Sequence, residues 1–140
     1  MINYEIYTDG AYSPSRDQGG IGIVFIKNGI KVYEFSKSFV STTNNRCELL
    51  AVIYALNSIS KQVNSITIYT DSQYIIGGTT KGWTRKKNVL LWKIYDHVYN
   101  KALKFCNNIE FKWVKGHNDS KFNKLADKLA VEASHEITEQ

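Results

Sequence analysis

The sequence predicts an α/β fold in which helices cover both faces of a mixed five-stranded sheet. Three β-type runs fill the first 40 residues, and two later β-type runs alternate with stretches whose apolar residues recur at helical spacing. A strand, a helix and a second strand form a right-handed crossover, which makes the two strands parallel. We therefore expect an antiparallel group of three strands, with the first strand and the two later strands parallel.

The antiparallel group comes from the N-terminal third of the chain. Residues 3–9 alternate in polarity and are rich in Tyr, Ile and Thr, and residues 20–27 and 31–40 form two more β-type runs. The last two runs are separated by Asn28-Gly29, which is a strong hairpin signal because both residues accept positive φ angles. The pattern predicts an antiparallel meander.

The first predicted helix carries a residue of interest near its start. Apolar residues recur at helical spacing from Leu49 to Ile59, and Asn44 or Asn45 is placed to cap the helix. Glu48 is expected in the first turn.

Shorter elements follow this helix. We expect a strand over residues 65–70, a brief helical stretch that Asp71-Ser72 opens and Gly77-Gly78 ends, a longer helix, a strand over residues 109–114, a loop over 116–122, and a helix from Asn123 to about His135. The inward faces of the last two helices are predicted to be Leu91, Ile94, Tyr95, Val98, Ala102 and Phe105, and Leu125, Leu129 and Ala133.

Length and composition indicate one compact domain. The chain has 140 residues, 43% of them hydrophobic, and a single proline, Pro14. We expect one domain over residues 1–140, with a core at about 3–135 and a short C-terminal tail. The most apolar segment, Leu49 to Leu56, is too short to span a bilayer, and Cys47 and Cys106 lack metal-ligand spacing. The expected setting is soluble and cytoplasmic, without a membrane.

Charge leaves two classes of protein open. Lys and Arg number 18 against 13 Asp and Glu, a formal charge of +5. A basic surface around a local acidic site suits a polyanion that is held by its phosphates and cut at a metal. A basic soluble protein without such a ligand has the same composition.

Four acidic residues are the candidates for such a site: Asp9, Glu48, Asp71 and Asp127. Asp9 and Asp71 stand at the carboxyl ends of predicted parallel strands, and such ends meet at one edge of a sheet. Carboxylates are hard oxygen ligands suited to Mg²⁺ or Mn²⁺. Taken singly, each acid also fits a turn residue, a helix cap or a solvated side chain.

Six short motifs together resemble the type 1 ribonuclease H family from about Tyr4 to Ala133. The motifs are Thr8-Asp9-Gly10; Thr43-Asn44-Asn45-Arg46 with Glu48-Leu49; Thr70-Asp71-Ser72-Gln73-Tyr74; Lys87-Asn88-Val89 with Leu91-Trp92; Trp113-Val114-Lys115-Gly116-His117; and Asn123 with Ala126-Asp127. Any one of them is weak, but all six occur in the family's order. The fold implied is a ribonuclease H-like sheet with helices on both faces.

The resemblance implies an endonuclease that hydrolyses the RNA strand of RNA/DNA hybrids, leaving 5′-phosphate and 3′-hydroxyl ends. Two Mg²⁺ ions per site, roughly 4 Å apart, are implied, with Mn²⁺ as a substitute. By this resemblance Asp9 bridges both ions, Asp71 and Glu48 complete one shell, and Asp127 helps hold the ion that activates water. His117 matches the histidine that assists proton transfer or product release.

The same resemblance implies residues that contact the substrate. Gly10, Asn45, Gln73 and Glu48 would meet ribose hydroxyls or minor-groove edges, with Asn44 close by, because 2′-hydroxyls distinguish RNA from DNA. Thr43 and Asn88 match a pocket for a phosphate of the DNA strand, and Trp83 matches a residue that packs on deoxyribose. Capping alone would also explain Asn44 and Asn45.

Three regions depart from the family pattern. Ser41 stands where an arginine often completes the phosphate pocket, and Arg46 is a candidate to compensate. The longer basic helix and loop of many bacterial members is reduced to a cluster of Lys81, Arg85, Lys86 and Lys87 around Trp83. A basic cluster of this kind suits phosphate contacts, but it also fits a solvated charge run. The loop after the first strand, residues 13–20, differs as well, so its contacts cannot be carried over.

Other functions remain in competition with a free-standing hybrid nuclease. A ribonuclease H domain associated with a reverse transcriptase or mobile element would keep the same chemistry. A catalytically silent hybrid-binding module would lack at least one acid, and all four are present. We expect a monomer that needs no obligate protein partner.

Overall fold

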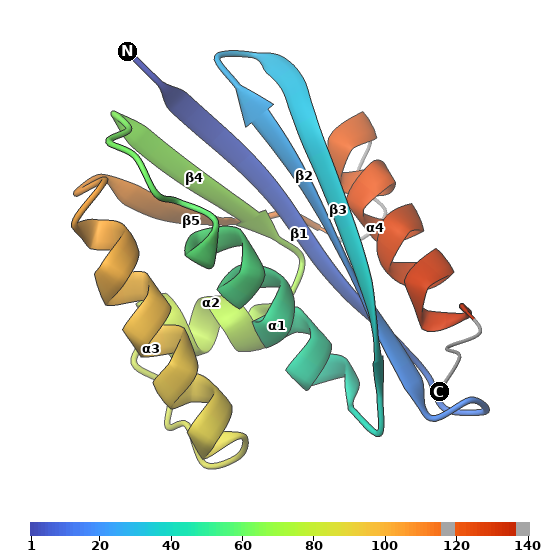
Figure 1. Cartoon of the computed structure of the whole chain (residues 1–140). Helices are drawn as coiled ribbons and strands as arrows, with labels where there is room; N and C mark the ends of the chain where they lie inside the picture. The colour runs from blue at the N-terminus through green and yellow to red at the C-terminus, as the bar shows by residue number, and fades with distance from the viewer. Residues whose placement is uncertain (116–119, 137–140) are drawn as a thin grey trace.

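A computed structural model describes residues 1–115 and 120–136, within which the chain forms one five-stranded sheet and four helices. The strands are β1 (Asn3–Ser13), β2 (Gln18–Lys27), β3 (Ile30–Val40), β4 (Ser65–Thr70) and β5 (Ile109–Trp113). The helices are α1 (Asn44–Asn57), α2 (Gln73–Thr80), α3 (Val89–Leu103) and α4 (Lys121–Ser134). Figure 1 shows α1, α2 and α3 on one face of the sheet and α4 alone on the other.

The sheet has the order β3-β2-β1-β4-β5. β1 pairs antiparallel with β2, and β2 with β3, whereas β4 is parallel to both β1 and β5. The predicted mixed sheet is therefore confirmed, including the turn at Asn28-Gly29, where φ is +49° and +85°. β1 runs four residues past its predicted end at Asp9, because pairing with β2 continues from Gly10 to Ser13.

Two apolar layers lie on opposite faces of the sheet. The larger layer, under α1 and α3, includes Ile6, Ile21 and Leu49, which are fully buried. The smaller layer, under α4, contains Val24, Ile26 and Ala126. The burial of both faces follows from the placement of helices on each side of the sheet.

Helix α4 lies unusually close to β2 because β2 carries glycines where the helix crosses it. A Cβ atom on Gly22 would overlap the carbonyl oxygen of Ala126, and one on Gly20 would lie 2.5 Å from the backbone nitrogen of Ser134. Ala126 and Ala130 are completely buried in this contact. Small residues on both sides thus set the height of α4 above the sheet.

The first helix is capped one residue earlier than the sequence suggested. Thr43 is the N-cap, and its hydroxyl accepts a hydrogen bond of 3.2 Å from the backbone N–H of Arg46. The prediction that Asn44 or Asn45 caps the helix is therefore wrong. Because α1 begins at Asn44, Glu48 lies just beyond the first turn rather than within it.

Helix α2 also differs from expectation, since it continues through Gly77-Gly78 to Thr80. The two glycines make room for tryptophan rings instead of ending the helix. A Cβ atom on Gly77 would overlap the ring of Trp83, and one on Gly78 would lie 2.5 Å from the ring of Trp92. Close side-chain packing explains why these glycines are tolerated inside a helix.

The last two helices bury slightly different faces than predicted. In α3, Ile94 is half-exposed, and Trp92 is buried in its place. Helix α4 begins at Lys121, two residues early, with Ser120 as its N-cap. Ala133 is buried as predicted, Leu125 and Leu129 pack partly buried against the layer under α4, and Ala126 and Ala130 are fully buried as well. Among the described residues, no helix is both long and apolar enough to cross a membrane.

Candidate active site

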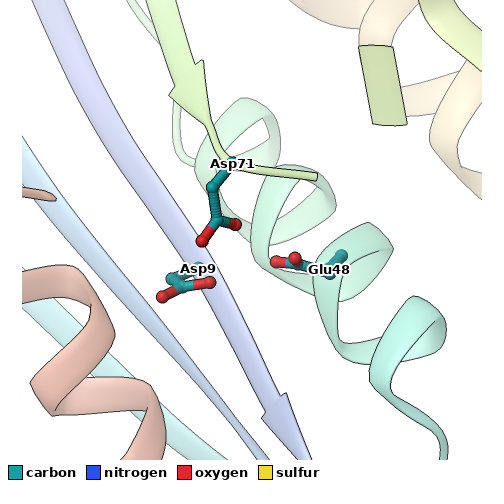
Figure 2. Close-up of side chains that lie close together, drawn as sticks. All are labelled: Asp9, Glu48 and Asp71. Atoms are coloured by element: carbon teal, nitrogen blue, oxygen red, sulfur yellow. The ribbon is translucent and has the colours of Figure 1, made fainter. Parts of the chain in front are cut away.

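Three acidic side chains from distant parts of the sequence meet at one end of the sheet. Asp9 comes from β1, Glu48 from α1 and Asp71 from the residue after β4, and Figure 2 shows their carboxylates turned toward one another. One oxygen of each lies within 4.8 Å of the others. Asp9 and Glu48 are buried, and Asp71 is partly exposed. We refer to these three residues as the carboxylate cluster.

Glycine at position 10 lets Glu48 approach Asp9. A Cβ atom on Gly10 would lie 2.6 Å from the carbonyl carbon of Cys47 and from the backbone nitrogen of Glu48. Since real Cβ atoms do not approach that closely, only glycine allows the start of α1 to press against β1. The backbone N–H of Gly10 also donates a hydrogen bond of 2.9 Å to Asp9 Oδ1.

Strand register places Asp71 beside Asp9. In the parallel pairing of β1 with β4, Tyr7 lies opposite Tyr69, and each aspartate follows its tyrosine by two residues. The indole N–H of Trp113, at the end of β5, donates a hydrogen bond of 3.2 Å to the carbonyl oxygen of Asp71. Register with β1 thus sets the position of Asp71, and a hydrogen bond from β5 holds its backbone.

The fourth predicted acid, Asp127, approaches Asp9 from the other face of the sheet. Asp9 lies opposite Gly22 in the pairing of β1 with β2, and Ala126 of α4 rests on that glycine. Asp127 follows Ala126 and is exposed, and its carboxyl group contacts that of Asp9. The structure thus adds Asp127 to the side of the carboxylate cluster.

Burial and like charge shift the protonation of the cluster strongly. The pKa of Asp9 is raised to about 8. Burial is the largest cause, followed by the charge of Asp71 and by the contact with Asp127 and its charge, whereas the hydrogen bond from the Gly10 N–H lowers the pKa by less. Burial and the charges of Asp9 and Asp71 raise the pKa of Glu48 well above its ordinary value. Within residues 1–115 and 120–136, no Lys, Arg or His side chain forms an ion pair with any of the three. The cluster lacks a countercharge from that part of the chain.

These properties fit a divalent cation. A hard cation such as Mg²⁺ prefers carboxylate oxygens, and its charge would stabilise their ionised form against the burial and the repulsion that raise the pKa values. Several carboxylates directed at one point are the expected protein ligands for such an ion. His117, predicted to assist the reaction, lies outside the described residues.

A second group of predicted residues lines a pocket of about 350 Å³ between the start of α1 and the start of α3. Thr43, Asn44, Asn45 and Asn88 line it together with Lys87. Four residues predicted to bind substrate are thus brought together. We call this the polar pocket.

A tyrosine that was not assigned a role orders one wall of the polar pocket. The hydroxyl of Tyr74 accepts hydrogen bonds from Trp92 Nε1 at 2.9 Å and from Asn88 Nδ2 at 3.2 Å. Asn88 has a left-handed backbone, with φ +57°, and its Oδ1 accepts a bond of 3.4 Å from Arg46 Nη1. Arg46 therefore brings a cation to this pocket, while Ser41 supplies none. The motif around Asp71 includes Tyr74, but only the fold reveals its partners.

The other residues predicted to bind substrate, Gln73 and Trp83, do not line the polar pocket. Gln73 is the first residue of α2, exposed and two positions after Asp71. Trp83 is half-exposed, with part of its ring against Gly77. In the predicted basic cluster, Arg85 is engaged in an ion pair of 2.7 Å with Asp96. The exposed lysines of that cluster are Lys81, Lys86 and Lys87.

Comparison with known proteins finds relatives that match over most of the chain. The model of the RNase H family matches residues 2–135. A ribonuclease H of Desulforamulus reducens is 38% identical over 138 residues, covering 92% of this chain and 86% of the relative. A ribonuclease H of Trichodesmium erythraeum is 39% identical over 142 residues, covering 94% and 88%.

Solved structures share the same fold. RNase H1 from the halophilic archaeon Halobacterium salinarum superimposes with a TM-score of 0.75 at 24% identity, covering 94% of this chain and 96% of that one. The N-terminal RNase H domain of a Mycobacterium tuberculosis protein, solved as a fusion with maltose binding protein, gives a TM-score of 0.79 at 22% identity, covering 96% and 94%. At these identities the likeness concerns the fold alone.

Proposed function

The chain belongs to the ribonuclease H family and is a hydrolase of that family, and we therefore propose that it cleaves the RNA strand of RNA/DNA hybrids with two divalent ions. The proposed products carry 5′-phosphate and 3′-hydroxyl ends. The observation that carries the proposal is the carboxylate cluster, whose three oxygens lie within 4.8 Å of one another in a chain of this family.

Each acid has a distinct place in the proposed reaction. Asp9 is proposed to share both ions, which is supported by the influence of both Asp71 and Asp127 on its carboxyl group. Glu48 and Asp71 would help Asp9 hold one ion, and Asp127 would help it hold the other. Bound Mg²⁺, or Mn²⁺ as a substitute, would lower the pKa of water and neutralise the phosphate charge. His117 is proposed to assist proton transfer or product release.

The polar pocket is proposed to bind a phosphate of the DNA strand. Thr43 keeps its hydroxyl hydrogen for a ligand, because that hydroxyl accepts rather than donates in the N-cap. Lys87 and Arg46 provide positive charge, and the Asn88 amide provides donors. A phosphate held there would fix the position of the hybrid relative to the carboxylate cluster.

Recognition of RNA is assigned to polar groups at or beside the two sites. Asn44, Asn45 and Gln73 are exposed amides on the first residues of α1 and α2, and Gly10 lies beside Glu48. Amides can donate to and accept from a 2′-hydroxyl, the group that distinguishes RNA from DNA. Trp83 is proposed to pack on deoxyribose.

The direct test uses strand-labelled substrates. The protein is incubated with an RNA/DNA hybrid, an RNA duplex or a DNA duplex, in Mg²⁺ or in EDTA, and the products are sized and end-mapped. We expect cleavage of the RNA strand of the hybrid alone, dependent on Mg²⁺, and a loss of about 1,000-fold or more in Asp9→Asn.

The matched control for Asp9→Asn is Glu34→Gln, which makes the same chemical change in an exposed surface ion pair with Lys31. This control should keep full activity. Cleavage of the DNA strand, or activity of Asp9→Asn equal to that of the control, would refute the proposed function.

A further inference from the structure

The loop of residues 81–88 joins α2 to α3 (Figure 1). One arginine of this loop, Arg85, contacts both helices. Arg85 donates two hydrogen bonds to the carbonyl oxygen of Gly78, from Nε at 3.1 Å and Nη2 at 2.8 Å. Its Nη1 donates to both carboxylate oxygens of Asp96 in α3, at 2.8 and 2.7 Å. The guanidinium carbon also lies 4.1 Å from the centre of the Trp92 ring. We call these contacts the Arg85 bridge.

The Arg85 bridge engages all three nitrogens of the guanidinium group. Asp96 neutralises its charge, and the Trp92 ring covers one face. A phosphate would have to displace at least one of these partners, and hydrogen bonds between charged groups, such as those to Asp96, are roughly twice as strong as neutral ones. Arg85 is therefore unlike Lys81, Lys86 and Lys87, whose side chains are exposed.

The bridge spans the two ends of the loop that carries these lysines. On one side, Trp83 donates its backbone N–H to the Gly77 carbonyl at 3.1 Å and packs its ring on that glycine. On the other side, Lys87 lines the polar pocket beside Asn88. Arg85 lies between them and joins the end of α2 to the middle of α3. The bridge thus anchors the loop at a point between Trp83 and Lys87.

We propose that Arg85 is a positioning residue for substrate binding, acting through the bridge to Asp96 and Gly78 rather than by touching phosphate. It holds Trp83, Lys86 and Lys87 where they meet the hybrid. This proposal rests on the proposed function, because it assigns the loop to the same substrate.

Asp96→Asn separates positioning from simple electrostatics. The substitution makes the protein one charge more positive, so electrostatics alone predicts tighter binding of a polyanion. Positioning predicts the opposite, since the bridge loses its ion pair. We expect KM for the hybrid to rise about fivefold in both Asp96→Asn and Arg85→Gln, with kcat within about twofold of the native value.

Three further variants sharpen the comparison. Arg85→Lys keeps the charge but loses the planar fork, and it should behave like Arg85→Gln. The double variant Arg85→Gln/Asp96→Asn should be no worse than either single one, because both break one interaction. Glu110→Gln changes an exposed residue of β5 and makes the protein one charge more positive, as Asp96→Asn does, without touching the Arg85 bridge. This variant should not raise KM.

Limited trypsin digestion measures how rigidly the loop is held, independently of enzyme activity. Asp96→Asn leaves every trypsin site intact, and we expect cleavage after Lys81, Arg85, Lys86 or Lys87 about tenfold faster than in the native chain or in Glu110→Gln. Thermal unfolding of each variant, measured alongside, shows whether the whole domain is still folded.

The outcomes distinguish this proposal from the proposed function. A lower KM in Asp96→Asn, or unchanged trypsin cleavage together with an unchanged KM, would overturn the positioning role. If the native protein neither binds nor cleaves the hybrid, the proposed function fails, and the role of the bridge in substrate binding fails with it. Trypsin digestion would then still decide whether the bridge orders the loop.

Discussion

The carboxylate cluster and the Arg85-bridged loop are built in different ways. The main chain places the cluster: strand register aligns Asp9 with Asp71, and Gly10 admits the start of α1. Side chains place the loop, through the contacts of Arg85 and Trp83 on an exposed segment. Catalytic geometry that rests on rigid elements tolerates little displacement, whereas a loop held by a few side chains can loosen without unfolding the protein. Changes in the first region should therefore affect kcat, and changes in the second should affect KM.

The largest effect is expected from Gly10→Ala, which attacks the main-chain construction of the cluster. The added Cβ atom would lie 2.6 Å from backbone atoms of Cys47 and Glu48, so α1 must move away from β1. We expect kcat/KM to fall about 100-fold, and the free energy of unfolding to fall by about 1–3 kcal/mol. Steady-state cleavage and urea denaturation measure the two quantities.

Gly29→Ala is the matched control for this experiment. Gly29 has a φ of +85° in the β2–β3 turn, and nothing lies within 4 Å of an added Cβ atom. Alanine there should cost about 1–2 kcal/mol of backbone strain while leaving kcat intact. Native activity in Gly10→Ala would show that the close approach of α1 to β1 is not needed for the reaction.

The next effect concerns pH and metal binding at the cluster. The pKa of Asp9 is raised to about 8, so the folded state without metal binds a proton that the unfolded state releases at about pH 4. The stability linked to this proton is present at low pH and is lost as pH rises from about 4 to about 8. Added Mg²⁺ should therefore raise Tm by several degrees at pH 8 and by less at pH 5, because protons compete with the metal.

Thermal melting in EDTA and in Mg²⁺ across this pH range measures the effect, with Asp9→Asn as the reference. The variant lacks the titrating group, so its Tm should depend less on both pH and Mg²⁺. An equal Mg²⁺ response of the native chain and the variant at pH 8 would argue against metal binding at Asp9.

Two neighbouring glycines test the second region against the core. In Gly77→Ala the added atom overlaps Trp83, which is half-exposed and can swing away, so KM should rise about fivefold with kcat retained.

In Gly78→Ala the added Cβ atom meets the ring of Trp92, a residue that is only 2% exposed and has no room to move away. The unfolding free energy should fall there by about 1–3 kcal/mol. If both variants changed stability alone, the loop would have no separate role in binding.

The difference between the two regions also explains what the sequence could predict. Strand ends follow from local pattern, so Asp9 and Asp71 were expected at one edge of the sheet. The position of Glu48 does not follow from local pattern, because its approach to Asp9 depends on the contact of Gly10 with α1. The family resemblance supplied the expectation that Glu48 joins the site. Thr43, Asn44 and Asn45 are all good caps, so residue type alone could not select Thr43.

The bridged loop was less predictable because its order comes from tertiary contacts. Arg85 and Asp96 are eleven residues apart, across a loop and a helix, with no periodicity to link them. Gly77 was interpreted as the end of a helix because glycine often stands there, but it serves the packing of Trp83. Charge alone groups Arg85 with the exposed lysines of the loop. Its hydrogen bonds to Gly78 and Asp96, which distinguish it from them, are seen only in the fold.

The smallest effect is expected from Trp113→Phe, which removes a single hydrogen bond to the cluster. The indole N–H holds the carbonyl oxygen of Asp71 at 3.2 Å, while the ring is 46% exposed. Losing this bond should cost about 0.5–1.5 kcal/mol, most of it in the position of Asp71. We expect kcat to fall about two- to fivefold with KM unchanged. A rise in KM at constant kcat would instead mean that the exposed ring contacts the substrate, and Trp113 would then belong with the loop rather than with the carboxylate cluster.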